Sequence, residues 1–352
     1  MLRTRVTELL GIEHPLLQAP MASAATPALA ASVSNAGALG ALGSAMLPVD
    51  ELRRQTAELR AQTGRPFQLN FFCHRRPQIE EQAASAARER FAALYDELGL
   101  GAPPAPSAPP IDFDDARLEA LLELRPAVVS FHFGLPPDDA LAAIRAAGMR
   151  VLASATTVAE AARLEERGVD AVVAQGAEAG GHRGSFLVEG DDGPVGTLAL
   201  VPQVVDAVDV PVIAAGGIAD GRGLAAVLAL GAGAAQVGTA FLPCPESGIS
   251  AVYREALRHA RADATTITRT FSGRPARALR NRLTEELEGV LPYPAQLSLT
   301  APLRELTPAG DPGAFQAMWS GQGAALAREA PAAEVVAAIS GDAARTLSSL
   351  SS

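Results

Sequence analysis

The sequence contains no lysine: all 29 of its Lys and Arg residues are arginine. Enzymes that form a Schiff base with a substrate or hold pyridoxal phosphate covalently need a lysine amine, so these classes are excluded. The P-loop of nucleotide hydrolases is excluded for the same reason, since its motif contains a lysine. The absence removes several common enzyme classes before any motif is considered.

Cysteines and long apolar runs are also scarce. Cys73 and Cys244 are the two cysteines, and they form no C-x-x-C motif. Reduced thiols are therefore expected, as is typical of a cytoplasmic protein. No apolar run reaches the roughly 18 residues that a membrane span needs. Glu8 and Glu13 interrupt the N-terminal segment, unlike a signal peptide.

The chain has 352 residues, of which 48% are hydrophobic, with a formal net charge of -10. This length and composition predict one large domain plus a smaller one. The acidic balance argues against a nucleic-acid or anionic-membrane partner, because phosphate would be repelled. The arginines from Arg274 to Arg282 are balanced by Glu285 and Glu286 nearby, which favours a solvated helix face over a polyanion site.

Apolar, β-rich runs alternate with helical stretches over the first 240 residues or so. This pattern is typical of βα repeats around a parallel sheet, and about eight units predict an α/β fold of the (β/α)8 TIM-barrel type. A Rossmann sheet is the competing fold, but the first turn, QAPMASAATP, lacks the G-x-G-x-x-G motif. The eight expected strands begin near Pro15, Ala38, Phe67, Ala127, Arg150, Ala171, Pro211 and Ala234.

Two segments depart from the βα alternation. Residues 75–125 hold a helix and the Pro-rich stretch GAPPAPSAPP between the third and fourth strands. Residues 246–314 are expected to form a small, mostly helical domain or lid on the substrate side. Residues 1–245 plus 315–352 would then form the barrel, with GAFQAMWSGQGAALAREA returning to a helix.

Polar side chains are placed to converge on the barrel top. In AVVSFHFG, period-2 alternation puts Ser130 and His132 on the face opposite Phe131. Asn70 lies on the inner face of its strand by the same logic. Amides here suit a ligand with alternating donors and acceptors, such as a flavin ring or ribityl chain; alternatively, the side chains satisfy one another. The further members of this set are Gln68, Gln175 and Gln236.

Glycines follow the seventh and eighth strands, in AAGGIADGRG and QVGTAF. The backbone N–H groups near Gly216, Gly217 and Gly238, with the hydroxyl of Thr239, could cradle a phosphate without lysine. The alternative is that these tight turns simply require glycine.

His182 lies among glycines in QGAEAGGHRG, directly before Arg183. Glycine offers a histidine little to pack against, so we expect a flexible loop whose imidazole meets a ligand. Arg183 either steers an anion or faces solvent.

Taken in order, these motifs resemble the nitronate monooxygenase (2-nitropropane dioxygenase) family, with SFHFG and PYP…WSGQ similar to its class I branch. The resemblance implies an enzyme with non-covalently bound FMN and no metal. We expect a monomer or homodimer. The resemblance further implies oxidation of alkyl nitronates, with nitroalkanes as a further option, by O2 to a carbonyl compound and nitrite, a detoxifying reaction.

The resemblance also assigns roles to residues. His182 would be the catalytic base or anion-binding group, and His132, Tyr293 and Trp319 would line the substrate side. The residues that would bind FMN are Pro20, Met21, Ala22, Asn70, Gln175, Gly180, Gly217, Gln236, Val237, Gly238 and Thr239.

The sequence departs from the family where the substrate would bind. Some class I members carry a tyrosine and a lysine shortly after PYP, whereas here the stretch reads AQLSLTAPLR. Anion binding is therefore expected to be weaker or to rely on arginine. Two other functions stay open: an FMN-dependent NAD(P)H:quinone or enoyl-thioester reductase, and a non-redox barrel that binds a phosphorylated ligand.

Overall fold

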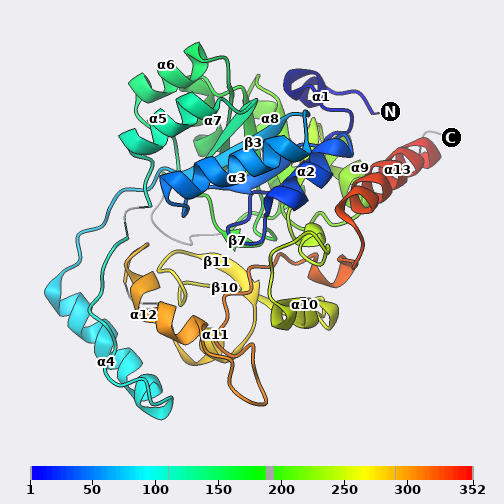
Figure 1. The fold of residues 1–352 in the computed structure, drawn as a ribbon. Coiled ribbons are helices and arrows are strands. Elements are labelled where there is room, and N and C mark those ends of the chain that lie inside the picture. Colours follow the sequence, from blue (N-terminus) through cyan, green and yellow to red (C-terminus); the bar gives the residue numbers. More distant parts are fainter. Residues whose placement is uncertain (1, 110, 188–193, 290, 351–352) are drawn as a thin grey trace.

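A closed barrel of eight parallel strands forms the centre of the protein, in a computed structural model that describes residues 2–109, 111–187, 194–289 and 291–350 (Figure 1). The strand order is β1-β9-β8-β6-β5-β4-β3-β2, and a parallel bridge between Leu17 and Leu39 joins the two edges. This confirms the predicted (β/α)8 barrel. The strands are β1 (Leu16–Gln18), β2 (Gly40–Gly43), β3 (Phe67–Phe72), β4 (Val128–His132), β5 (Arg150–Ala155), β6 (Ala171–Gln175), β8 (Val212–Ala215) and β9 (Ala234–Val237).

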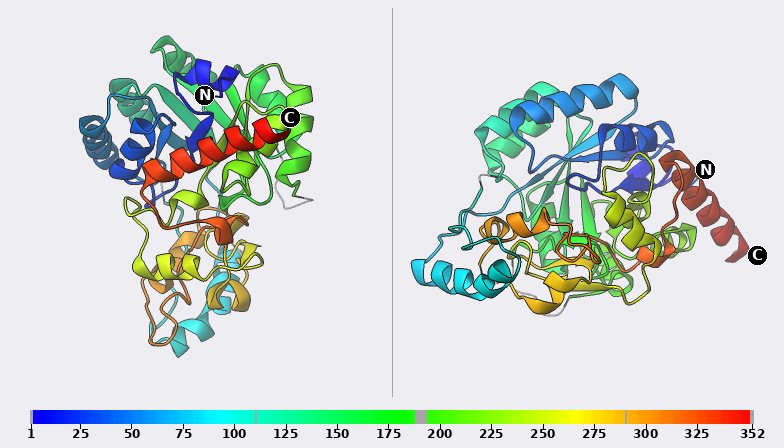
Figure 2. Two further views of the ribbon diagram at one scale, coloured as in Figure 1. Left: turned by 90° about the vertical axis from the view of Figure 1, so that its right-hand side faces the viewer. Right: turned by 60° about the horizontal axis from the view of Figure 1, so that its bottom comes forward.

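Helices surround the barrel, as the two further views show (Figure 2). Several begin at a side chain that accepts a hydrogen bond from the first turn; Thr26, Thr157 and Asp220 are examples. Such caps satisfy amide groups that have no partner within the helix. The helices are α1 (Arg5–Leu10), α2 (Pro27–Asn35), α3 (Val49–Gln62), α5 (Asp115–Leu124), α6 (Asp138–Ala146), α7 (Val158–Glu166), α8 (Thr197–Ala207), α9 (Gly221–Ala229) and α13 (Ala332–Leu350).

The two faces of each strand lie in different cores. Val129 and Phe131 of β4 belong to the apolar layer between sheet and helices, whereas Val128 belongs to the barrel interior. Alternation along the strand therefore turns Ser130 and His132 inward, as the sequence pattern predicts. Polar inner-face residues at the carboxyl ends of the strands position the site described below, whereas Gln68 lies deeper in the barrel and donates to the backbone oxygen of Gln18.

A second unit lies below the barrel in Figure 1. It contains α10 (Ala251–Arg258), α11 (Arg282–Glu286), α12 (Gln296–Arg304) and a three-stranded sheet of β10 (Thr265–Thr268), β11 (Ala276–Leu279) and β7 (Gly181–His182). The expectation of a mostly helical segment missed this sheet. Its core also includes α4 (Glu81–Glu97), because Phe91 and Tyr95 pack in one cluster with residues 271–315. The proposed boundaries at 245 and 314 stay a prediction.

The segment before α13 is not the helix that we expected. Residues 313–331 are mostly irregular, with one short 3-10 helix, η2 (Ala324–Leu326). Gly321 explains part of this path, since a Cβ atom there would lie 2.7 Å from the backbone oxygen of Glu178. Close contact with the loop after β6 therefore overrides the helical pattern.

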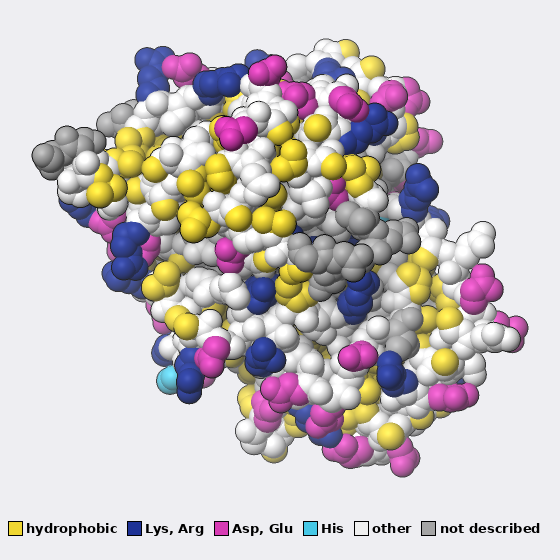
Figure 3. Space-filling view, turned by 180° about the vertical axis from the view of Figure 1, so that it is seen from behind, with side chains coloured by type: hydrophobic (Ala, Val, Ile, Leu, Met, Phe, Trp, Pro, Cys, Tyr) yellow, Lys and Arg dark blue, Asp and Glu magenta, His cyan; other side chains and the backbone are white. Residues whose placement is uncertain are grey.

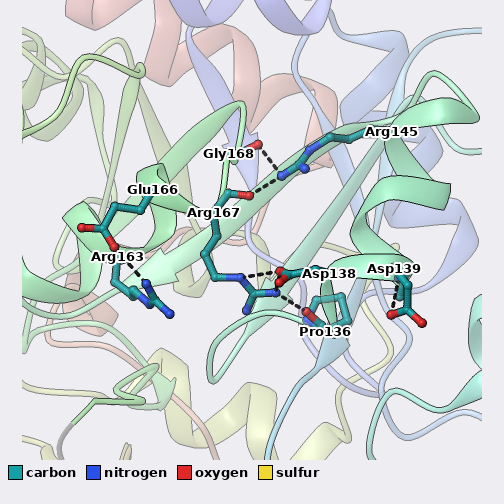
Figure 4. A network of polar contacts seen from close by, with 9 residues as sticks. Pro136, Asp138, Asp139, Arg145, Arg163, Glu166, Arg167 and Gly168 are labelled. Carbon is teal, nitrogen blue, oxygen red and sulfur yellow. Dashed lines mark hydrogen bonds and ion pairs between the residues drawn. The ribbon is translucent and has the colours of Figure 1, made fainter.

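Charged side chains of both signs are interspersed over the face seen from behind (Figure 3). Many form exposed pairs, such as Arg163 with Glu166. Arg167 links two βα units by donating to the backbone oxygen of Pro136 at 2.8 Å and to Asp138 at 3.0 Å (Figure 4). Exposed pairs contribute only about 0–1 kcal/mol each, so this network aligns loops more than it adds stability. Among the helices of the described residues, none has the length and hydropathy needed to cross a bilayer.

Candidate active site

A cavity of about 850 Å³ lies at the carboxyl ends of the barrel strands. Loops after β1, β6, β8 and β9 form one side, and Tyr253, Trp319 and other residues of the second unit form the other. Barrel enzymes bind their ligands at this end, and ligand pockets span about 300–1,000 Å³. The cavity has the position and size of an active site.

Most of the predicted site residues meet at this cavity. Two do not line it in the described structure. The side chain of Val237 lies in the apolar layer around the barrel, so Val237 could contribute only backbone atoms. Tyr293 is buried behind His182, with the ring centroids 5.2 Å apart. The predicted residues that line the cavity are Pro20, Met21, Ala22, Asn70, His132, Gln175, Gly180, His182, Gly217, Gln236, Gly238, Thr239 and Trp319.

His182 is held by one hydrogen bond and several aromatic rings. Its Nε2 atom lies 2.9 Å from the hydroxyl oxygen of Ser272, which is itself buried. Trp319 packs beside it with a centroid separation of 5.3 Å, and Phe72 contacts it edge-on at 6.3 Å. These contacts fix the imidazole at the cavity wall.

The loop that carries His182 is not the flexible segment that its glycines suggested. His182 pairs with Ala276 across the second sheet. The amide of Gln175 donates to the backbone oxygen of His182 at 3.0 Å and accepts from the N–H of Gly184 at 2.8 Å. Backbone pairing and side-chain bonds together hold the loop.

Two buried charged residues complete this support. Arg183 neither faces solvent nor lines the cavity: it is 5% exposed and donates to the backbone oxygens of Gln175 and Gly176. Glu160 is fully buried, and its carboxylate accepts the N–H groups of Phe186 and Leu187 beyond the histidine. Both side chains use their charge to satisfy backbone groups of the loop.

Burial keeps the site histidines neutral. It lowers the pKa of His182 to about 3, with smaller contributions from His132, Arg274 and His74, and it lowers the pKa of His132 to about 4. Burial likewise lowers the pKa of His74 to about 4. The imidazole of His182 is therefore neutral, and not a cation, near neutral pH.

The polar groups of the barrel strands are only partly satisfied by one another. The amide nitrogen of Asn70 donates to the hydroxyl oxygen of Ser130 at 3.0 Å and to the Ser130 backbone oxygen at 3.2 Å, which leaves the amide oxygen of Asn70 for a ligand. Gln236 makes no side-chain hydrogen bond within the described residues, although it lines the cavity. These amides can therefore meet a ligand with both donors and acceptors.

Glycines from three parts of the chain meet on another wall of the cavity. A Cβ atom on Gly180 would lie 2.5 Å from the nitrogen of Gly321, and Gly216 and Gly217 have φ angles of 118° and 70°. The N–H of Gly321 donates to the hydroxyl of Thr239 at 2.9 Å. Gly217 and Gly238 line the cavity beside these contacts, where no side chain covers their backbone, as a phosphate cradle requires.

Sequence reasoning missed several residues of the site. Ser272, Phe72 and Arg304 carried no periodic or motif signal that linked them to His182 or to the cavity. Gly321 was visible only as part of WSGQ. Ser272 is 90 residues from its histidine, so only the tertiary structure could pair them.

A closed (β/α)8 barrel with a partly buried, neutral histidine on a cavity at the carboxyl ends of its strands has the architecture of a barrel enzyme. Comparison with known proteins makes this specific. The family described as nitronate monooxygenase matches residues 3–342. A nitronate monooxygenase of Pseudomonas aeruginosa is 49% identical over 339 residues, which cover 94% of this chain and 97% of that protein.

Solved structures agree with this match. Nitroalkane oxidase from Streptomyces ansochromogenes superposes with a TM-score of 0.90 at 40% identity, covering 98% of this chain and 99% of that one. FabK from Thermotoga maritima gives a TM-score of 0.77 at 34% identity, covering 100% of this chain and 99% of that one. The chain belongs to the nitronate monooxygenase family, whose members are flavin-dependent oxidoreductases.

Proposed function

We propose that this enzyme binds FMN and oxidises alkyl nitronates with O2 to a carbonyl compound and nitrite. The observation that carries the proposal is the neutral His182 on the wall of a cavity with a glycine cradle and unsatisfied amides. The family match supports the same reaction class.

The residues present fit FMN. The glycines around Gly217 and Gly238 would hold the phosphate, while Asn70 and Gln236 would meet the ring or ribityl chain. The N-termini of α8 and α9 are already occupied by the carboxylates of Glu178 and Asp220, so the phosphate would depend on the glycine backbone. Gln175 has one amide hydrogen left for the cofactor after its two bonds to the loop.

The flavin supplies the electron acceptor for the reaction, and the protein supplies position and proton transfer. When the hydroxyl of Ser272 accepts from Nε2–H of His182, Nδ1 is the unprotonated nitrogen and can remove a proton from the carbon of a nitroalkane. A nitronate has already lost that proton. His182 therefore acts as a base when the substrate is a nitroalkane. When the substrate is a nitronate, His182 only lines the cavity as an uncharged side chain.

Anaerobic stopped-flow mixing tests the proposal. A nitronate is expected to reduce the flavin of the purified enzyme, whereas NADH is expected to leave it oxidised over the same time. A flavin that stays oxidised with every nitronate would refute the proposed reaction. Rapid bleaching by NADH would instead favour the alternative of an NAD(P)H:quinone or enoyl-thioester reductase. A colourless protein without heat-releasable flavin would favour the non-redox barrel.

Substitution of Gly321 is expected to lower the flavin content. In Gly321→Ala the new Cβ would lie 2.7 Å from the oxygen of Glu178 and 3.0 Å from the nitrogen of Gly180, so the cradle must open. We expect less than half of the wild-type FMN after gel filtration, measured by absorbance of the heat-released cofactor. Gly64→Ala is the matched control, because no atom lies within 4 Å of its Cβ position. Full flavin content in Gly321→Ala would contradict the assignment of the cradle.

Other expectations stay predictions. These are a cytoplasmic location, a monomeric or homodimeric state, and a metal-free site. Among the described residues no group of three or more His, Cys, Asp or Glu side chains could hold a metal ion.

A further inference from the structure

The cavity wall carries one formally charged side chain within the described structure, and it is a cation. Arg304, the last residue of α12, lines the cavity, and no aspartate or glutamate lines it in the described residues. The Nε atom of Arg304 is buried and has no hydrogen-bond partner there. A buried polar atom without a partner costs roughly 1–3 kcal/mol, so the site is incomplete without a ligand.

Two buried arginines elsewhere in the protein are engaged by hydrogen bonds from their guanidinium groups. Arg183 donates to two backbone oxygens, and Arg277 donates to the oxygen of Ala177 and the hydroxyl of Thr265. Arg304 makes no ion pair in the described part of the chain, and the only charge that acts on it is the exposed Glu305 beside it. Among the described residues, the fold thus leaves this guanidinium without a carboxylate partner at the cavity.

We propose that Arg304 is the anion-binding residue of the active site and that its ligand is the substrate, held through the two oxygens of a nitronate or of a carboxylate. A guanidinium presents parallel N–H donors that match two oxygens on one planar centre. This assignment rests on the proposed function and names a residue and a substrate class for it.

The location favours the substrate over the flavin phosphate. Leu303, the neighbour of Arg304, belongs to the core of the second unit, against which Trp319 packs. Trp319 in turn contacts His182. The glycine cradle is built from the β6, β8 and β9 loops with Gly321. Because His182 is neutral, no other side chain of the described cavity wall supplies a positive charge to an anionic substrate.

The variant Arg304→Gln tests the assignment in the holoenzyme. We expect KM for ethyl nitronate and propionate 3-nitronate to rise about 10- to 100-fold with a smaller change in kcat, whereas KM for neutral nitroethane stays within twofold. Arg304→Lys should recover part of the loss. Arg261→Gln is the control, because Arg261 is an exposed arginine outside the cavity. An effect on propionate 3-nitronate alone would identify a carboxylate as the bound group.

A binding measurement tests the role of Arg304 independently of whether the enzyme oxidises nitronates. Trp319 is the single tryptophan of the chain and lines the cavity, so its fluorescence can report nitrate binding whether or not a nitronate is oxidised. We expect nitrate to bind at least tenfold more weakly to Arg304→Gln and normally to Arg261→Gln. Equal nitrate affinity, or nitronate KM values equal to wild type, would overturn the proposal.

Two further readouts distinguish other roles. Loss of FMN from Arg304→Gln, with normal nitronate KM in the molecules that retain it, would assign Arg304 to the phosphate and overturn the proposal. Arg304→Met is expected to keep or raise the melting temperature, because it removes an unpaired buried charge. A large fall in melting temperature for both Arg304→Met and Arg304→Gln, with normal nitrate binding, would show a structural role instead.

Discussion

Replacement of His182 by asparagine is expected to reduce nitroalkane turnover by about 10²- to 10⁴-fold, the usual contribution of a general base. The asparagine amide cannot accept a proton from carbon near neutral pH. The side chain of His182 bonds only to Ser272 in the described structure, while the surrounding loop is held through its backbone. The variant should therefore fold and keep its flavin.

The same variant separates base catalysis from substrate binding. A preformed nitronate needs no deprotonation, so its turnover should stay within about tenfold of wild type. Initial rates of oxygen consumption with nitroethane and with ethyl nitronate give both values. His259→Asn is a matched control, because His259 is exposed on α10 and bonds to Glu255. Unchanged nitroethane turnover in His182→Asn, with flavin retained, would refute the role of the base.

The wild-type protein is expected to lose stability steeply as the pH falls from 6.5 to 5. Burial lowers the pKa of His182 to about 3, and it lowers the pKa values of His74 and His132 to about 4. In the unfolded chain these groups titrate near pH 6.5, so the unfolded state binds more protons in this range. The free energy of unfolding is therefore highest above pH 6.5. It decreases as the pH falls toward the pKa values that these histidines have in the folded protein.

The size of this effect follows from proton linkage. Each histidine contributes at most about 1.4 kcal/mol per pH unit, so the three together contribute up to about 4 kcal/mol per pH unit. Urea unfolding at pH 7, 6 and 5 measures how much the free energy of unfolding changes per pH unit. His74→Phe is expected to reduce this change by about one third, because both ring nitrogens of His74 are buried without a partner in the described residues. A flat profile in the wild type would contradict the neutral, buried histidines.

Local patterns were enough to predict the barrel. All eight barrel strands were foreseen, because apolar runs of strand length alternate with helical stretches whatever the rest of the chain does. The pattern was misleading where contacts between distant segments decide the conformation. The strands β7, β10 and β11 are short, and the region before α13 is bent by the close approach of Gly321 to Glu178.

The glycine-rich loop around His182 was also predicted only in part from local sequence. Its composition marked it as unusual, and its position after β6 brought it to the catalytic end. The sequence could not show that Gln175, Arg183, Glu160 and β11 hold the loop in place. All four bond to backbone atoms, which carry no residue signature. A loop predicted to be flexible is therefore an ordered part of the site.

By itself, the sequence determined the order of strands and helices, the glycines at the ends of the barrel strands, and the presence of one histidine among them. These depend on local periodicity and residue type. Only the tertiary structure decided that His182 is partly buried and neutral, that Ser272 holds it, and that Arg304 lines the cavity with its Nε atom unpartnered within the described residues. Burial and pairing are properties of side chains brought together from distant positions, so no local pattern contains them.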